Sequence, residues 1–213
     1  MRDEPLALLR RVGILPIARG VPAANLEAAA DLLLEVGIGI VEVTMNSTDA
    51  SGTIRRLADR YEGRLIVGAG TVLDADLATA AVDAGAEFLV TPHVDESVAA
   101  AAHRLKVPFV PGALTPTEIL RAWRAGAALV KLFPAVTVGP QYLRQLRGPL
   151  PDIPLLPTGG VSVENTAEFI AAGAVAVGVG GALLGRQAGD LSWLRTEVMK
   201  FVSAVQRGRQ QHA

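Results

Sequence analysis

A lysine inside an apolar stretch is the position in this sequence with the clearest chemical potential. Lys131 lies within residues 127–135, which read AALVKLFPA. Such a run is typical of a buried strand, and a lysine is rarely buried there unless it is paired or has a chemical task. Burial disfavours the charged form, so the pKa of the amine falls and the neutral amine can form a Schiff base with a carbonyl. Alternatively, Lys131 extends its ammonium group from a strand end into water.

A carboxylate and a guanidinium also lie in or beside apolar runs. Glu42 is part of IGIVEVT and shares the inward parity of Ile40 and Thr44. Desolvation would raise its pKa and suit it to acid–base catalysis, whereas a charged Lys131 nearby would oppose that shift. A structural Glu–Lys ion pair is the alternative. Arg19 could bind a substrate carboxylate through two parallel N–H bonds, or it could be a solvated arginine at a strand end.

Glycine-rich turns follow the last two apolar runs. One turn contains Thr158, Gly159 and Gly160, and the other ends with Gly180 and Gly181. Glycines let backbone N–H groups approach an anion closely, so both turns could hold a phosphate. The alternative is that these glycines only allow the chain to turn.

Three further positions at the ends of apolar runs could contribute polar contacts. Thr71, in GAGT, could form a hydrogen bond to a carboxylate or a carbonyl. Pro92 and His93 follow the run FLVT. A histidine can move protons near neutral pH, although a single loop histidine more often has no such role.

The elements that must position these residues alternate regularly. Strands are expected at residues 12–20, 38–44, 64–68, 87–91, 107–111, 127–135, 153–158 and 174–180. Helices are expected at residues 5–11, 23–36, 48–61, 74–84, 95–105, 115–125, 139–147, 163–172 and 190–207. This alternation predicts an α/β fold with parallel strands, and eight units in this length predict a closed (β/α)8 TIM barrel with a short N-terminal helix. An open doubly wound sheet is the alternative, but no GxGxxG follows the first run.

The composition agrees with one domain, residues 1–213, and excludes several classes of function. Half of the residues are hydrophobic and the net charge is −1, so nothing indicates a nucleic-acid partner. The chain has no cysteine, and its three histidines lack the spacing of metal ligands. No run is long enough to span a membrane and the start lacks a signal-peptide pattern, which predicts a soluble, cytoplasmic protein with no membrane partner.

Eight motifs taken together resemble a known family. They are ILPIARG, VEVTMNS, VGAGTVL, FLVTPHV, VPGALTPTE, KLFPA, LPTGGVSVEN and VGVGGALL, in order from residue 14 to residue 184. This set is similar to the 2-keto-3-deoxy-6-phosphogluconate and -galactonate aldolases, a family that also includes 4-hydroxy-2-oxoglutarate aldolase activity. The resemblance covers nearly the whole chain.

The resemblance implies a class I aldolase without a metal or other cofactor. Lys131 would form the Schiff base with the keto carbon, and Glu42 would move protons through water. Cleavage of the phosphorylated substrate would give pyruvate and glyceraldehyde 3-phosphate. Arg19, Thr71 and Pro92 would line the pocket for the pyruvate portion, and Phe133 would pack beside the lysine. Gly159, Gly160, Gly180 and Gly181 would hold the phosphate, and Thr158 is a further expected substrate-binding residue. The family is typically homotrimeric, which implies the same assembly for this chain.

Two signals disagree on the substrate's configuration at C4. Asn46, together with Arg19 and GPQY at residues 139–142, resembles the galactonate branch, whereas PTGG at residues 157–160 resembles the gluconate branch. Two alternatives of other kinds are also open. One is a pyruvate-dependent aldolase for an unphosphorylated 4-hydroxy-2-oxo acid. The other is a phosphate-binding barrel without aldolase activity, in which Lys131 is only a charge partner of Glu42.

Overall fold

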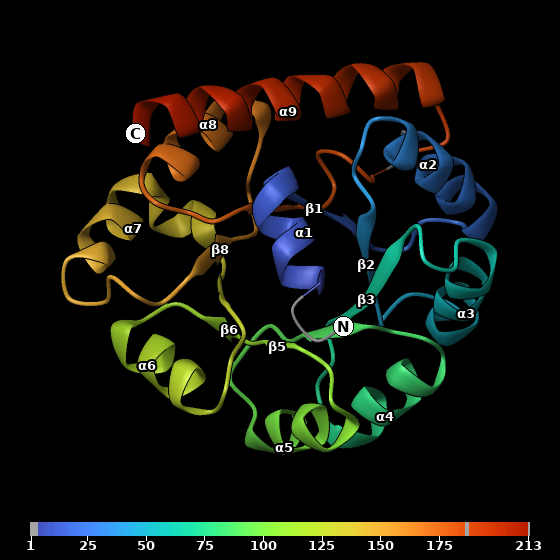
Figure 1. Ribbon diagram of the computed structural model, residues 1–213, viewed down its shortest axis with the longest axis horizontal. Helices are drawn as coiled ribbons and strands as arrows, with labels where there is room; N and C mark the ends of the chain where they lie inside the picture. The colour runs from blue at the N-terminus through green and yellow to red at the C-terminus, as the bar shows by residue number, and fades with distance from the viewer. Residues whose placement is uncertain (1–3, 186–187, 213) are drawn as a thin grey trace.

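The computed structural model of the chain describes residues 4–185 and 188–212, in which helices alternate with strands (Figure 1). The strands are β1 (Ile14–Ala18), β2 (Ile40–Thr44), β3 (Ile66–Gly70), β4 (Phe88–Val90), β5 (Phe109–Val110), β6 (Gly112–Ala113), β7 (Val130–Leu132), β8 (Leu155–Pro157) and β9 (Val177–Val179). The helices are α1 (Glu4–Val12), α2 (Ala23–Glu35), α3 (Ala50–Arg60), α4 (Ala75–Asp83), α5 (Glu96–Leu105), α6 (Pro116–Arg124), α7 (Gly139–Arg147), α8 (Val163–Ala171), α9 (Leu191–His212) and the short 3-10 helix η1 (Ala135–Thr137). The predicted order of elements is confirmed, including the helix before the first strand.

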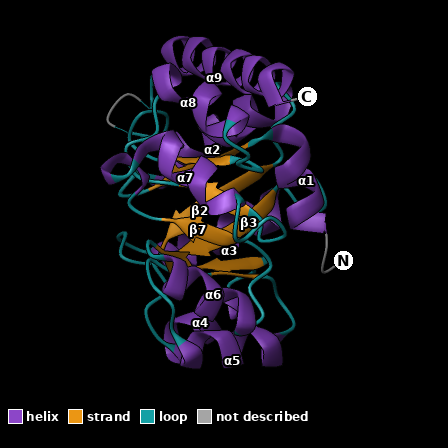
Figure 2. Cartoon of the chain, turned by 90° about the vertical axis from the view of Figure 1, so that its left-hand side faces the viewer, coloured by secondary structure: helices purple, strands orange, loops and turns teal. Residues whose placement is uncertain are grey.

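The strands form two parallel sheets. The order is β5-β4-β3-β2-β1-β9 in the larger sheet and β6-β7-β8 in the smaller one. An isolated parallel bridge between Thr158 and Gly178 connects the end of β8 to β9. Figure 2 shows the strands at the centre and the helices outside them. The predicted α/β architecture with parallel strands is therefore confirmed.

The third strand ends later than predicted. The sequence predicts a strand at residues 64–68 followed by a turn, whereas β3 continues through Ala69 and Gly70. Its pairing with β2 is the reason, because Thr44 is the partner of Gly70 and the N–H of Met45 donates to Gly70 O at 2.7 Å. Bonds to a neighbouring strand thus extend β3 through residues that have little intrinsic preference for strands.

The other predicted strands are all shorter than expected, and two of them show a physical reason or a change of structure within the run. The run at residues 107–111 forms only β5, and the chain resumes as β6 after Pro111. A proline has no N–H to donate to a ladder, which accounts for the interruption. Within residues 127–135 only Val130–Leu132 is strand, and the end of the run enters η1.

Helix starts that the sequence marks with capping residues are confirmed. Asp74 Oδ1 accepts a hydrogen bond from Leu77 N at 2.7 Å at the start of α4. Thr115 and Glu118 form a capping box at the start of α6. Each such cap contributes about 1 kcal/mol to the stability of its helix.

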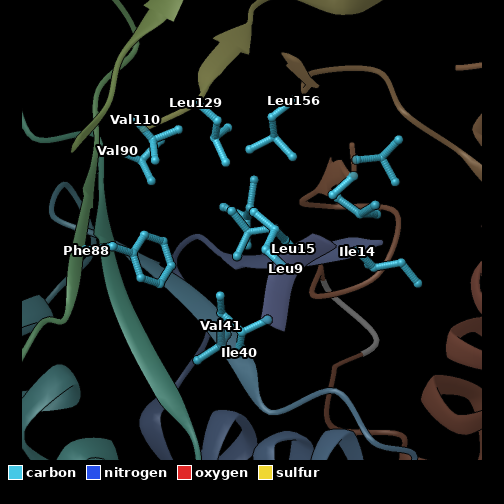
Figure 3. Close-up of a cluster of buried hydrophobic side chains, with 14 of the residues drawn as sticks. Leu9, Ile14, Leu15, Ile40, Val41, Phe88, Val90, Val110, Leu129 and Leu156 are labelled. Carbon is cyan, nitrogen blue, oxygen red and sulfur yellow. The ribbon is translucent and has the colours of Figure 1, made fainter. Parts of the chain in front are cut away.

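The core lies between the strands and is closed at one end by α1. Figure 3 shows Phe88, Val90, Val110, Leu129 and Leu156 directed toward a common centre. Leu9 of α1 and Leu15 of β1 are both buried in this cluster. Since α1 directly precedes β1, it covers the N-terminal ends of the strands (Figure 1). The C-terminal ends are therefore left for a functional site.

Candidate active site

The candidate nucleophile lies in the middle of β7. Lys131 is 4% exposed, and its backbone N–H donates to Pro111 O at 2.9 Å. Its register partners are Gly112 of β6 and Leu156 of β8. The Nζ atom lies over the ring of Phe133, 5.1 Å from the ring centroid. The lysine is buried rather than extended into water, as the Schiff-base interpretation requires.

Glu42 is the most completely buried acid near this lysine. Its side chain is 0% exposed, and neither Oε1 nor Oε2 has a hydrogen-bond partner. Burial raises the pKa of Glu42, and the positive charges of Lys131 and then Arg19 act in the opposite direction. Among the ion pairs of the described residues, none joins Glu42 to Lys131. The arrangement therefore favours a proton-transfer group over a structural ion pair.

Arg19, which follows β1, and Thr71, which follows β3, are in contact across the end of β2. Arg19 Nη2 donates to Thr71 Oγ1 at 3.4 Å. Thr71 adopts a φ of 55°, a conformation that costs a β-branched residue about 1–3 kcal/mol. The strained backbone holds the threonine hydroxyl beside the guanidinium, and the exposed Arg19 remains able to bind an anion.

Ser47, which the sequence analysis did not identify, lies in the loop after β2 and connects that loop to the loop after β1. The N–H of Gly20 donates to Ser47 Oγ at 2.9 Å, and Ser47 Oγ lies 3.0 Å from Thr44 Oγ1. Thr44 follows Glu42 by two residues on β2, so Ser47 connects the Arg19 loop to the strand that carries Glu42. A hydroxyl three residues after EVT is a weak signal, because serine is common in any loop.

A cavity of about 450 Å³ opens at these strand ends. Its charged lining groups, among the described residues, are Arg19 and Lys131. Its remaining lining residues are Ile17, Phe133, Thr158, Gly159, Gly160, Val161, Gly178, Gly180, Gly181, Ala182, Leu184 and Gly185. The cavity thus brings together the predicted lysine, arginine and both glycine turns. The apolar lining residues were not predicted, since nothing in their types separates them from the core.

The short helix η1 is hydrogen-bonded to the glycine turn that follows β8. Ala135 N donates to Thr158 O at 2.8 Å, and Val136 N donates to Gly159 O at 2.9 Å. Gly159 and Gly160 have φ values of 88° and 75°, which favour glycine. A Cβ at Gly160 would lie 2.7 Å from Val136 Cγ2, so this glycine also allows close packing. In contrast, a Cβ at Gly181 would meet no atom within 4 Å, and its backbone borders open space.

The described lining of this cavity does not include Glu42, Thr71, Pro92 or His93. Pro92 is partly buried at the end of β4, but it does not line this cavity as far as the structure describes it. Its carbonyl packs against Gly112 of β6. His93 is exposed, with Nε2 3.8 Å from Oδ2 of Asp95, the residue that caps α5. Asn46 is exposed beside the Ser47 loop.

A second cavity of about 510 Å³ lies away from this chemistry. It is bordered by His103 and Lys106 at the end of α5 and by Val107 and Pro108, which precede β5. It therefore belongs to the opposite end of the strands. We place the candidate active site in the smaller cavity, because that cavity contains the buried lysine.

The described residues offer neither a metal site nor a membrane-spanning helix. No group of three or more His, Cys, Asp or Glu side chains there is arranged to hold a metal ion. In the described segments, no helix has the length and apolar character needed to cross a membrane.

Comparisons with known proteins match almost the whole chain. Residues 6–200 match the family described as KDPG and KHG aldolase. The 2-dehydro-3-deoxy-phosphogluconate aldolase of Pseudomonas aeruginosa is 40% identical over 165 residues, which cover 77% of this chain and 74% of the relative. The 2-dehydro-3-deoxy-6-phosphogalactonate aldolase of Escherichia coli K12 is 33% identical over 171 residues, covering 80% and 83%. A solved 4-hydroxy-2-oxoglutarate/2-dehydro-3-deoxyphosphogluconate aldolase has a TM-score of 0.86 and 36% identity, covering 94% of this chain and 98% of that one.

Proposed function

Because the chain belongs to the KDPG and KHG aldolase family, we propose that it is a class I aldolase for 2-keto-3-deoxy-6-phospho-sugar acids of the gluconate or galactonate type. It is an aldehyde-lyase, and its products are pyruvate and glyceraldehyde 3-phosphate. The observation that carries this proposal is the burial of Lys131, 4% exposed, in the lining of a cavity. The buried, unpartnered carboxyl of Glu42 lies within reach of the charge of this lysine.

The first step is imine formation at Lys131. The neutral amine attacks the C2 keto carbon and forms a carbinolamine, which then loses water to leave a protonated imine. Glu42, whose pKa burial raises, supplies and accepts the protons of these steps through a water molecule. The ring of Phe133, which Lys131 Nζ contacts, packs beside the reacting carbon.

The second step breaks the C3–C4 bond. Glu42 accepts the proton of the C4 hydroxyl through water, and the bonding electrons move into the imine to give an enamine. The aldehyde leaves, the enamine takes a proton at C3, and water hydrolyses the resulting imine. This last reaction releases pyruvate and regenerates the free amine of Lys131, so atoms and electrons balance without a cofactor.

The remaining residues bind the two ends of the substrate. Arg19, held beside Thr71, binds the carboxylate, while Thr158 lines the cavity next to the lysine. Pro92 supports this end through its contact with Gly112. Backbone N–H groups of Gly159, Gly160, Gly180 and Gly181 hold the phosphate.

The larger architecture follows the same family pattern. We infer a closed (β/α)8 TIM barrel that forms one domain over residues 1–213. The Thr158–Gly178 bridge and the bond from Lys131 N to Pro111 O support closure, because they join the smaller sheet to its neighbours.

We also infer a homotrimer in the cytoplasm. Exposed apolar side chains such as Leu73 and Val136 supply surface for subunit contacts, and a mass of three chains in light scattering would agree with this assembly.

Borohydride reduction in the presence of pyruvate tests the proposal. A pyruvate adduct on the peptide that contains Lys131, found by mass spectrometry and missing in Lys131→Arg, is the expected result. The arginine variant keeps the charge but cannot form an imine. Aldolase activity that survives in Lys131→Arg would rule out the Schiff-base mechanism and favour a phosphate-binding barrel without this activity.

A second candidate substrate is an unphosphorylated 4-hydroxy-2-oxo acid. The observation in its favour is that, among the described lining residues, the glycine turns carry no positively charged side chain of their own. The ratio of kcat/KM for phosphorylated and unphosphorylated substrates separates the two candidates. A ratio near one would favour the unphosphorylated acid, and a large ratio would favour the phospho-sugar acid.

A further inference from the structure

Strand β3 presents glycines where its neighbours present side chains. Its sequence IVGAG alternates between Gly68 and Gly70 on one face and Val67 and Ala69 on the other. A Cβ at Gly68 would collide with the ring of Phe88, which comes from β4. A Cβ at Gly70 would collide with Oε1 of Glu42, which comes from β2, and would lie 2.7 Å from its Cγ. Two neighbouring strands therefore fill the space in front of β3.

The requirement for glycine at position 70 comes from space rather than from backbone conformation. Gly70 is not among the glycines with a positive φ, so an alanine could adopt its backbone geometry. Its place is fixed by the ladder with Thr44 and by the bond from Met45 N to Gly70 O at 2.7 Å. The backbone cannot retreat from an added methyl group without breaking this pairing. The carboxyl of Glu42 is consequently the group that has to move.

We propose that Gly70 is a positioning residue that keeps the carboxyl of Glu42 in the buried space in front of β3. The proposal rests on the proposed role of Glu42 in proton transfer, and it adds a residue that touches neither substrate nor product. The charged groups that face Glu42 are Lys131 from β7 and Arg19 from the end of β1. A carboxyl displaced from this space would change its distance to both.

The variant Gly70→Ala tests this positioning. We expect kcat to fall by about 100-fold or more, the size of effect that a misplaced acid–base group produces, with little change in KM. The acidic limb of the pH–kcat profile should move to lower pH, because burial raises the pKa of Glu42 and displacement relieves that burial. Borohydride trapping of pyruvate on Lys131 should persist, since the lysine is on another strand.

Gly148→Ala is a matched control. Gly148 caps the C-terminus of α7 with φ −60° and ψ −63°, and a Cβ there would lie 3.5 Å from its nearest neighbour, Gln145 O. This variant should keep the wild-type kcat and pH profile. Full activity with an unchanged pH profile in Gly70→Ala would overturn the proposal. A loss of activity without any pH shift would do the same, because it would indicate general damage to the sheet.

Shortening Glu42 provides a rescue that a purely structural role of Gly70 would not produce. In Glu42→Asp/Gly70→Ala the acid is one methylene shorter and leaves room for the methyl group, so kcat should exceed that of Gly70→Ala alone. If Gly70→Ala unfolds, Glu42→Ala/Gly70→Ala should restore the melting temperature of Glu42→Ala. The same loss of melting temperature in both backgrounds would mean that the methyl group collides with something other than Glu42, and the proposal would fail. This comparison of melting temperatures does not depend on whether the wild-type protein forms an adduct with pyruvate. It therefore distinguishes an error in the role of Gly70 from an error in the proposed function.

Discussion

The side chain of Thr158 occupies the space that a side chain at Gly178 would fill, and the same two residues form the bridge between β8 and β9. A Cβ at Gly178 would lie 3.0 Å from Thr158 Cγ2 and would collide with its Oγ1. Both residues line the candidate cavity. The contact therefore links the bridge between the two sheets to the lining of the cavity.

The first prediction concerns this contact. Gly178→Ala should lower the free energy of unfolding by about 1–3 kcal/mol, the usual cost of overpacking a buried position. Urea unfolding followed by circular dichroism measures the effect. The double variant Thr158→Gly/Gly178→Ala should recover most of the loss, and an equal loss in both backgrounds would show that Thr158 is not the group that is crowded.

The second prediction concerns the nucleophile. Lys131→Arg should reduce kcat on the order of 10⁴-fold or more, since removal of a covalent nucleophile leaves only binding and electrostatic effects. Steady-state kinetics with a coupled assay for released pyruvate measures the loss. Lys200→Arg on the exposed face of α9 is the matched control and should retain wild-type kcat. Comparable losses in both variants would contradict the assignment.

The third prediction concerns pH and stability. Because burial raises the pKa of Glu42 in the folded chain, the folded state holds a proton that the unfolded state releases as pH rises above the unfolded pKa. The stabilising contribution of the protonated carboxyl is thus complete at low pH and is lost as pH rises through the folded pKa. Glu42→Gln removes this titration, so its stability relative to wild type should increase between pH 5 and pH 8. Urea unfolding at both pH values tests this, and parallel behaviour of the two proteins would contradict it.

The fourth prediction concerns Ser47. Ser47→Ala removes the acceptor for Gly20 N and the contact with Thr44 Oγ1. The Arg19 loop should then be less well held, and KM should rise by about 3- to 10-fold, corresponding to one hydrogen bond of 0.5–1.5 kcal/mol. Ser203→Ala, which removes a bond to Met199 O on α9, is the matched control and should leave KM unchanged. An unchanged KM in Ser47→Ala would show that Arg19 is held by other contacts.

The main elements and the central residues could be predicted from the sequence for a physical reason. Strand and helix periodicities depend on which residues face the core, and this hydrophobic pattern can be read from short segments of the sequence. Lys131 and Glu42 were identifiable because a charge inside an apolar run has to have a partner or a task. The structure buries both side chains, as this reasoning predicts.

Other features depend on contacts between strands that are distant in sequence. Gly70 was predicted to lie in a turn after a strand that ends at residue 68, yet pairing with β2 keeps it in the strand. Its significance becomes visible only when the side chain of Glu42 is seen in front of it. Pro92 was predicted to line the pocket, whereas its visible contact is with the backbone of Gly112. Such relationships have no local signature.

The helix that precedes the first strand has a consequence for the order of events. Because α1 covers the N-terminal ends of the strands, substrate and products reach Lys131 from the C-terminal ends, where the glycine turns lie. The pyruvate portion, which is bound to the lysine, is then released last, and the aldehyde, which lies nearer the opening of the cavity, is released first. In the direction of synthesis the sequence reverses, so pyruvate has to load before the aldehyde blocks its route.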